Sequence, residues 1–305
     1  MYPINASIRE ISDNSWLIAD NFLLRRQETV SPSLASWSDE NGAFYVLSTA
    51  SAPIPKTRVL PATSGLQKVY DAGDASAVWR VGEAFIKLKV LITPNATREH
   101  TTLQYLWDKH PLGFNIPEVY HYADLGERYL IILGRLPGLT LNEIWYEMDE
   151  TARQACVSRI ANICMSLTTW TGEFISGVDG NQLTEQYLIK PRAEMDFDPS
   201  HLLKSCDEMG MDCSSFVFYH CDLGPGNILF DTTDCSIGII DWETAGYVPK
   251  EWIRTKFRCS SGMDLPEKSG EVIPQHDWRR RVSQELEKLG FSDVVENWLT
   301  WRAVK

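Results

Sequence analysis

The clearest pattern of apolar and polar positions lies between residues 216 and 247, where three short apolar runs are separated by turn residues. The runs begin at Phe216, Asn227 and Ile237, and Gly, Pro, Asp and Thr bound them, which predicts three strands with tight connections. Asp222 follows the first run, Asn227 opens the second, and Asp241 ends the third. The pattern therefore predicts that three polar side chains meet on rigid strands in one small region.

These residue types suit the transfer of a phosphoryl group from a nucleotide. Asn227 and Asp241 offer hard oxygen ligands of the kind that Mg²⁺ prefers, and Asp222 is left to accept or orient the proton of an attacking hydroxyl. Any one of the three, taken alone, is better explained as a turn former or a cap. Their order and shared context favour catalysis.

The spacing strengthens this interpretation. His220, Asp222 and Asn227 form the pattern H-x-D-x-x-x-x-N of kinase catalytic loops, and Asp241 stands where those enzymes place a second metal-binding Asp. We expect His220 to be structural, with its ring hydrogen-bonded to nearby backbone, because the Asp two residues later carries the proton chemistry.

The stretch resembles the aminoglycoside phosphotransferase and choline kinase branch of the protein-kinase-like fold, because Ile-Asp-Trp-Glu at 240–243 replaces the Asp-Phe-Gly of protein kinases. The continuation at 245–257 is similar to the fungal subgroup of that family, and the resemblance extends over residues 65–299. It implies a bilobal α+β fold with a strand-rich first lobe and a mainly helical second lobe. Glu243 is interpreted as a structural residue that supports the metal site or a neighbouring helix.

The first lobe is expected from residue 61, after an extension over residues 1–60 that shows no strong periodicity and either packs on this lobe or forms a mobile arm. Strands are predicted at Val69–Tyr70, 77–81 and 84–90, although the turn at 71–76 lacks the G-x-G-x-x-G of a phosphate-binding loop.

Phe85, Lys87 and Lys89 alternate onto one face of the last of these strands. The resemblance implies that Lys87 reaches the nucleotide phosphates, with Lys89 as the alternative. It also implies that Glu99 pairs with the lysine. Glu99 falls in the first turn of a helix predicted to start at a Thr97 cap, where it would also complement the helix dipole.

The boundary between the lobes is predicted at 136. An apolar strand at Tyr129–Leu133 ends in Gly134, Arg135 and Leu136, followed by Pro and Gly. The resemblance implies that the backbone of these three residues hydrogen-bonds the adenine edge. Residues 137–305 would form the second lobe with the catalytic loop, the metal site and the acceptor site, and a core helix is predicted over 151–170.

Composition and charge limit the possible partners. No basic start precedes an apolar run, and no window approaches the roughly 18 apolar residues of a membrane helix, so we expect a cytoplasmic protein with no membrane partner. The net charge of −12 argues against nucleic acid. Residues 141–305 hold 27 Asp and Glu against 16 Lys and Arg, which suggests a cationic acceptor or, equally simply, a solvated acidic surface. Seven scattered Cys argue against disulfides and zinc.

The sequence therefore predicts a phosphotransferase that uses ATP and Mg²⁺ to phosphorylate a hydroxyl of a small molecule. GTP stays open as the donor, and the acceptor and the oligomeric state are not specified. The alternative is a nucleotide-binding pseudokinase or interaction module, which the missing glycine-rich loop favours. A protein kinase is disfavoured because no Ala-Pro-Glu signal or long activation segment follows Asp241.

Overall fold

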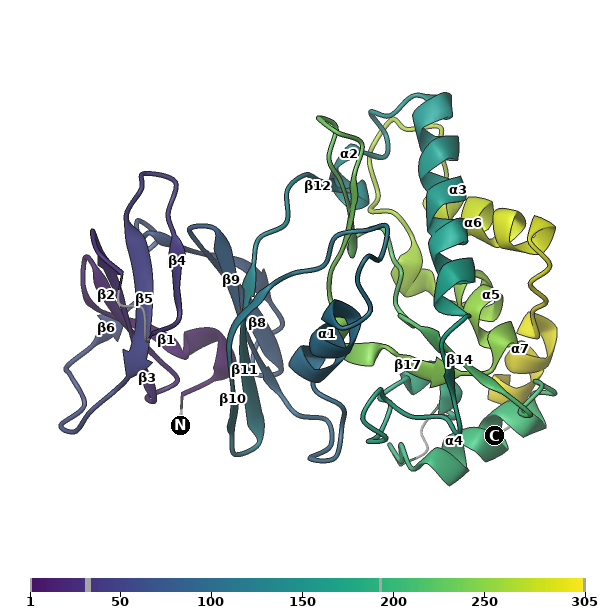
Figure 1. The fold of residues 1–305 in the computed structure, drawn as a ribbon, viewed down its shortest axis with the longest axis horizontal. Coiled ribbons are helices and arrows are strands. Elements are labelled where there is room, and N and C mark those ends of the chain that lie inside the picture. Colours follow the sequence, from purple (N-terminus) through teal and green to yellow (C-terminus); the bar gives the residue numbers. More distant parts are fainter. Residues whose placement is uncertain (1, 31–33, 192–193, 304–305) are drawn as a thin grey trace. The chain divides into compact units, whose positions relative to one another are not determined.

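The computed structural model describes residues 2–30, 34–191 and 194–303. The chain divides into two compact units, the first made of residues 1–94 and 117–135 and the second of residues 95–116 and 136–305. Each unit is described by itself. The first consists mainly of strands and the second mainly of helices (Figure 1), which confirms the predicted α+β class.

The first unit opens with a six-stranded antiparallel sheet, here called the N-terminal sheet, in the order β4-β5-β3-β2-β1-β6. Apolar runs such as Trp16-Leu17-Ile18 are continuous in it rather than alternating, so their sequence gives no period of two. The extension is therefore largely a folded sheet. Its strands are β1 (Ile8–Ser12), β2 (Ser15–Ile18), β3 (Phe22–Gln27), β4 (Ser36–Ser38), β5 (Phe44–Thr49) and β6 (Arg58–Val59), preceded by the short turn η1 (Ile4–Ala6).

A second antiparallel sheet of the first unit has five strands in the order β10-β11-β9-β8-β7. In β9, Ala84, Ile86 and Leu88 are buried, while Lys87 and Lys89 lie on the opposite, half-buried face, as the alternation predicts. The strands are β7 (Leu66–Asp71), β8 (Ser76–Val81), β9 (Ala84–Val90), β10 (Val119–Leu125) and β11 (Arg128–Gly134).

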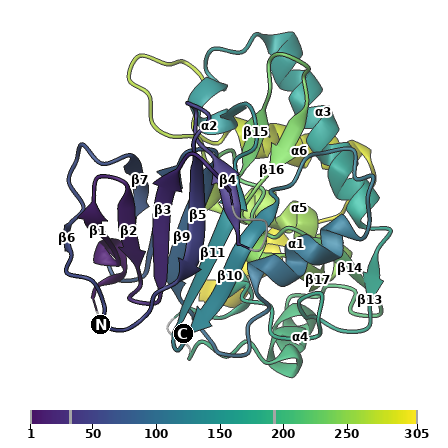
Figure 2. The same ribbon diagram turned by 60° about the vertical axis from the view of Figure 1, so that its left-hand side comes forward.

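Figure 2 shows the strands of both sheets of the first unit, and side chains from the two sheets form one apolar core. Trp16 and Tyr45 come from the N-terminal sheet, and Trp79, Ile86 and Ile132 come from the five-stranded sheet. Removing a fully buried Trp side chain typically costs about 3 to 5 kcal/mol. The N-terminal sheet therefore stabilises the sheet that carries Lys87, and the alternative of a mobile arm is wrong for the described part of residues 1–60.

The second unit packs helices around two small antiparallel sheets. The predicted stripe of the long helix α3 is buried, and Asp149 caps this helix by accepting from the backbone N–H of Ala152 (2.7 Å). Its helices are α1 (Glu99–Trp107), α2 (Leu141–Ile144), α3 (Glu150–Leu167), α4 (Pro199–Glu208), α5 (Lys250–Cys259), α6 (Asp277–Lys288) and α7 (Val295–Ala303), and its short turns are η2 (Gln186–Leu188), η3 (Trp242–Thr244) and η4 (Ser261–Met263). The strands are β12 (Leu139–Thr140), β15 (Ile228–Phe230) and β16 (Ile237–Ile239) in one sheet and β13 (Thr171–Gly172), β14 (Phe216–Tyr219) and β17 (Gly246–Val248) in the other.

The predicted cap of α1 is wrong. The helix begins at Glu99 after Arg98, which makes no side-chain cap, and the hydroxyl of Thr97 donates instead to the carboxylate of Asp179 at 2.5 Å. Thr97 therefore hydrogen-bonds a residue that is distant in the sequence instead of the backbone at the start of α1. Trp107, the last residue of the helix, is 43% exposed.

In the described ranges, each helix is too short or too polar to cross a membrane.

Candidate active site

The loop between β14 and β15 is closed by its own polar residues. The side-chain amide of Asn227 donates to the backbone oxygen of Asp222 (2.8 Å) and to its carboxylate (3.1 Å). The backbone N–H of Asn227 donates to the oxygen of Gly224 (3.0 Å). The chain between Asp222 and Asn227 therefore folds back on itself and brings these two residues together, as the motif predicts.

Burial changes the acidity of Asp222. Desolvation raises the pKa of this carboxyl to about 6, while the positive charge of Lys256 acts in the opposite direction. A general base is most effective when its pKa lies near the operating pH, because it is then both ionised and basic enough to take a proton. Asp222 has the protonation behaviour that its predicted role requires.

His220 has the structural role that we expected from the sequence. Its ring accepts from the backbone N–H of Asp222 at Nδ1 (3.2 Å) and donates from Nε2 to the backbone oxygen of Ile240 (2.9 Å). These partners assign the neutral tautomer with the proton on Nε2. Complete burial lowers the pKa of His220 to about 4, which keeps the ring neutral. The ring thereby links the catalytic loop to the residue that precedes Asp241.

Asp241 stands at a strained position directly after β16. Its φ of 64° and ψ of 57° are left-handed, a conformation that non-glycine residues rarely adopt. The preceding residue is fixed, because the N–H of Ile240 donates to the oxygen of Asn227 (3.0 Å). The backbone thus turns from the strand into η3 at Asp241, and the surrounding hydrogen bonds hold the strain in place.

The carboxylate of Asp241 lies in a cluster with those of Glu99 and Glu243, and one oxygen from each lies within 4.8 Å of the others. Glu99 is 1% exposed and accepts from the backbone N–H of Trp242 (3.1 Å). Three carboxylates this close repel one another unless protons or a cation compensate their charge. Their hard oxygen donors fit Mg²⁺ rather than a soft metal.

The sequence interpretation did not assign Glu243 to this cluster. The signal was present as the pair Asp241-x-Glu243, which places two carboxylates on one short turn. Glu99 comes from α1, far away in the chain, and local spacing does not indicate that it joins the pair.

Residues that sequence reasoning missed hydrogen-bond the backbone of the catalytic loop. The indole N–H of Trp278 on α6 donates to the oxygen of Leu223 (3.2 Å), and the backbone N–H of Asn142 donates to the oxygen of Pro225 (3.2 Å). A Cβ on Gly226 would lie 2.9 Å from Nδ2 of Asn142, so only glycine fits there without a shift. These contacts fix the loop on which Asp222 stands.

A buried ion pair lies near the same loop. The ammonium group of Lys256 donates to both carboxylate oxygens of Glu185 (2.7 and 2.6 Å), and the two side chains are 5% and 2% exposed. Glu185 also accepts from the indole of Trp252 (3.4 Å). The pair is satisfied by its partners, and its charges affect the pKa of Asp222 in opposite directions.

The nucleotide-binding residues predicted on β9 and β11 belong to the first unit. Lys87 lies opposite Val78 of β8 and Ile131 of β11. Glu99 belongs to the second unit, so the predicted Lys87–Glu99 pair stays a prediction.

At the predicted hinge, the N–H of Gly134 donates to the oxygen of Glu118 (2.8 Å), and the N–H of Arg135 donates to the oxygen of Glu83 (2.9 Å). The guanidinium of Arg135 also pairs with the carboxylate of Glu83 at 3.2 Å. Leu136 begins the second unit, and its N–H has no acceptor within the described part of the chain. Adenine binding by these three residues stays a prediction.

A family model described as the phosphotransferase enzyme family matches residues 8–249. A comparison with curated proteins finds no match.

Solved structures that are similar to this chain at low identity include three aminoglycoside phosphotransferases. The aminoglycoside-3'-phosphotransferase of type VIII is 15% identical with a TM-score of 0.45, over 78% of this chain and 92% of that one. A thermostable mutant of aminoglycoside phosphotransferase APH(4)-Ia, in a ternary complex with AMP-PNP and hygromycin B, is 15% identical with a TM-score of 0.49, over 78% and 83%. APH(3'')-Id from Streptomyces rimosus is 15% identical with a TM-score of 0.48, over 78% and 91%.

Proposed function

Because the chain belongs to the phosphotransferase enzyme family, we propose that it transfers the terminal phosphoryl group of ATP to a hydroxyl group of a small molecule. The observation that carries this proposal is the closed loop in which Asn227 hydrogen-bonds Asp222, beside Asp241 at the end of β16. Residues of these types, joined in this way, supply the base and the oxygen ligands that phosphoryl transfer requires.

Asp222 acts as the base. Its carboxylate would accept the proton of the acceptor hydroxyl, and its raised pKa suits proton transfer near neutral pH. Asn227 donates to Asp222 through Nδ2, which both orients the base and leaves the amide oxygen available for a cation.

Asn227 and Asp241 would hold Mg²⁺, and Glu243 and Glu99 add negative charge beside them. When bound, the cation supplies charge that neutralises the phosphate oxygens during transfer. The left-handed turn fixes the backbone of Asp241 before any ligand arrives, so little conformational entropy remains to be lost on binding.

For the nucleotide, Lys87 would contact the phosphates and Glu99 would orient Lys87. The backbone at 134–136 would bind the purine. Because the N–H groups of Gly134 and Arg135 already have acceptors in the first unit, Leu136 is the hinge residue whose N–H would donate to the base. Main-chain recognition leaves no side-chain signature of the base in the sequence, so ATP and GTP are both tested as donors.

The acceptor is a small alcohol. A cationic acceptor would be favoured by the acidic second half of the chain. Residues 141–305 contain 27 Asp and Glu but only 16 Lys and Arg. Amine-bearing alcohols and their neutral analogues therefore form the first pair of acceptors to compare, and equal binding of the two would remove the preference for a cation.

The test is a thermal-unfolding titration of the purified chain with ATP, GTP and Mg²⁺, with Asp241→Asn beside the wild type. A ligand that binds only the folded state stabilises it by about 2.7 kcal/mol at a hundredfold excess over its dissociation constant. We expect a Mg²⁺-dependent stabilisation that Asp241→Asn removes. Asp234→Asn, an exposed turn residue after β15, is the matched control that should keep it.

No stabilisation of the wild type by either nucleotide would exclude the kinase proposal and favour an interaction module that keeps the fold. Stabilisation that Asp241→Asn leaves intact would mean that the metal ligands are assigned wrongly.

A further inference from the structure

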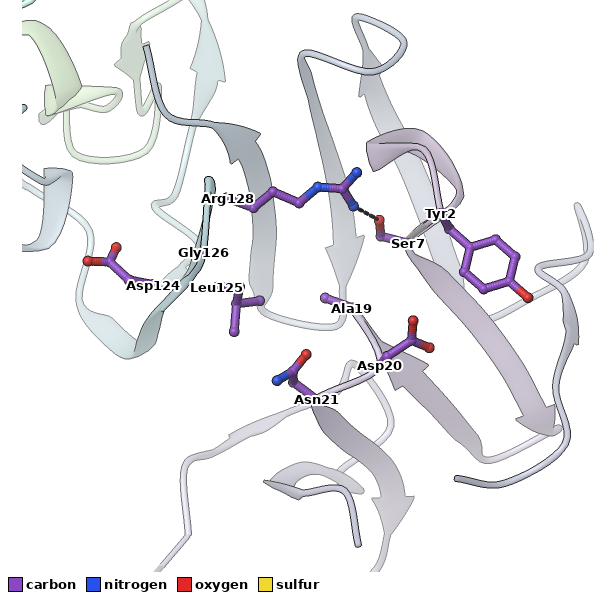
Figure 3. A pocket seen from close by; sticks show the side chains of 9 residues that line it. All are labelled: Tyr2, Ser7, Ala19, Asp20, Asn21, Asp124, Leu125, Gly126 and Arg128. Atoms are coloured by element: carbon purple, nitrogen blue, oxygen red, sulfur yellow. Dashed lines mark hydrogen bonds between the residues drawn. The ribbon is translucent and has the colours of Figure 1, made fainter. Parts of the chain in front are cut away.

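A cavity of about 370 Å³ lies within the first unit, between the N-terminal sheet and the turn that joins β10 to β11 (Figure 3). None of the predicted catalytic, nucleotide-binding or metal-binding residues lines it. The N-terminal segment contributes Tyr2, Ser7, Ala19, Asp20 and Asn21, and the β10–β11 turn contributes Asp124, Leu125, Gly126 and Arg128.

Arg128 places a positive charge in this cavity with little to balance it. Its side chain is 13% exposed, and in Figure 3 its guanidinium extends toward Ser7. Nη1 donates to the hydroxyl of Ser7 at 3.3 Å, and the nearest carboxylate oxygen, on Asp74, is 3.8 Å away, which exceeds hydrogen-bond distance. A guanidinium has five N–H donors, so most of the donors of Arg128 are available to a ligand that enters the cavity. Among the described residues, Arg128 has this one long hydrogen bond.

The carboxylates that line the cavity do not supply the missing acceptor. Asp20 pairs with Arg9. Figure 3 shows the carboxylate of Asp124 directed away from Arg128. Asn21 adds an amide that can donate to a ligand or accept from it. The hydroxyl of Ser7 already donates to the backbone oxygen of Pro3 (3.0 Å) and accepts from Arg128, so it keeps one lone pair to accept from a ligand hydroxyl.

We propose that this cavity is a binding site for a small hydroxylated anion, with a phosphate or carboxylate group on Arg128 and its hydroxyls on Ser7 and Asn21. A guanidinium suits both anions because its fork of donors matches two oxygens at once. The volume lies in the range of small-molecule sites, which begins at about 300 Å³.

The cavity wall is held in place without a ligand. Ala19 and Asp20 form the tight turn between β2 and β3, with φ of 51° and 60°, and the N–H of Asn21 donates to the oxygen of Ile18 (3.0 Å). The pairing of Asp20 with Arg9 fixes this turn, and the guanidinium of Arg9 stacks on the ring of Tyr2 at 3.9 Å. The site is therefore preorganised, which reduces the entropy lost when a ligand binds.

The experiment is isothermal titration calorimetry of the full chain with inorganic phosphate, glycerol phosphate and glycerate, at constant ionic strength. Glycerol serves as the uncharged comparison, and the two charged glycerol derivatives distinguish phosphate from carboxylate. Asp241→Asn is titrated in parallel. Binding that persists in Asp241→Asn but not in Arg128→Gln belongs to the cavity rather than to the proposed nucleotide site.

We expect Arg128→Gln to weaken binding of at least one anionic probe tenfold or more, while Arg80→Gln leaves it unchanged. Arg80 is the matched control because it lies on β8 of the same unit, pairs with Glu40 and does not line the cavity. Asp74→Asn should tighten binding, because it removes the competing charge and keeps an oxygen for the N–H of Ile4.

If Arg128→Gln does not fold, two other variants test the proposal. Asp74→Asn should bind the anionic probes more tightly, and Ser7→Ala should bind them more weakly. The proposal is overturned if the wild type binds none of the anionic probes at 10 mM concentration, on the order of the weakest affinities of physiological interest. It is equally overturned if Arg128→Gln, or this pair of substitutions, leaves every affinity unchanged.

Discussion

The catalytic stretch of the second unit and the N-terminal sheet of the first unit both contain non-glycine residues in the left-handed conformation, but in different surroundings. Cys221 and Asp241 have φ of 64°, and both flank the buried ring of His220. Ala19 and Asp20, with φ of 51° and 60°, form a half-buried hairpin turn above an apolar core. The catalytic stretch therefore gives up stability to orient polar groups, whereas the N-terminal sheet gains stability from buried apolar surface.

The same difference appears in what each region buries. The catalytic stretch buries His220 and most of Asp222, each held by specific hydrogen bonds. The N-terminal sheet buries Trp16, Leu24 and Leu47, which need packing rather than partners. Substitutions in the first region should therefore affect activity more than stability, and those in the second region should affect stability first.

The largest expected effect is on turnover in Asp222→Asn. Removing the proposed base should lower kcat by roughly 10³-fold, about 4 kcal/mol in the barrier, because general-base catalysis contributes about 10² to 10⁴. Nucleotide-dependent stabilisation should be retained. Formation of ADP from ATP in the presence of the best acceptor measures turnover, with Asp234→Asn as the exposed control. Full activity in Asp222→Asn would show that this residue is not the base.

The second prediction addresses the N-terminal sheet. Trp16→Ala should destabilise the protein by about 3 to 4 kcal/mol, since this side chain is 1% exposed within the shared core. Val59→Ala on the edge strand β6, 86% exposed, should change the stability by less than about 0.5 kcal/mol. Urea denaturation of the two variants measures both values. A small effect of Trp16→Ala would mean that the extension contributes little to the folding of the first unit.

These two regions were not equally predictable from sequence. The loop with Asp222 and Asn227 was predicted because its polar residues interrupt short apolar runs at motif spacing, and the structure brings the two side chains within hydrogen-bond distance. The N-terminal sheet was missed because three of the four residues of β2, Trp16-Leu17-Ile18, form a continuous apolar run. Its turn to β3 also uses Ala19 and Asp20 in place of the expected Gly or Asn.

The candidate site shows the same limit. The proximity of Asp241 and Glu243 follows from their separation of two residues, but Glu99 joins them through the packing of α1 against η3. Trp278 supports the catalytic loop from α6, far away in the sequence. Contacts of this kind depend on tertiary packing, which local periodicity and propensity do not determine.

The third prediction concerns the stability that the catalytic stretch gives up. The pKa of Asp222 is raised to about 6 by burial, from an ordinary value of 3.8. The folded state therefore binds the proton of Asp222 more tightly than the unfolded state does. The stability that this proton adds to the folded protein is complete below pH 3.8 and is lost as the pH rises through 6. The neutral side chain of Asp222→Asn does not ionise, so this variant keeps its stability as the pH rises. At 1.36 kcal/mol for each pH unit between the two pKa values, it should be more stable than the wild type at pH 7 by about 2 to 3 kcal/mol.

The check is chemical denaturation of both proteins at pH 4 and pH 7 without added Mg²⁺. The advantage of Asp222→Asn should be small at pH 4 and largest at pH 7. His220 has its pKa lowered to about 4, so its own effect has the opposite sign, with stability lost as the pH falls from 6.5 toward 4. Both proteins contain His220, so its effect cancels in the difference. A constant difference across this range would contradict the role of burial.

The smallest expected effect compares the two strained positions directly. Ala19→Gly should stabilise the protein by about 0.5 to 1 kcal/mol, because glycine relieves a left-handed strain of about 1 to 2 kcal/mol and loses part of that gain to the greater entropy of the unfolded chain. Cys221→Gly relieves a similar strain but removes a side chain that is fully buried, and it should destabilise the protein by about 1 kcal/mol. Urea midpoints of the two variants give both signs. If both substitutions stabilise the protein, Cys221 contributes little packing, and the strain in the catalytic stretch is held by the hydrogen bonds of His220 and Asn227 alone.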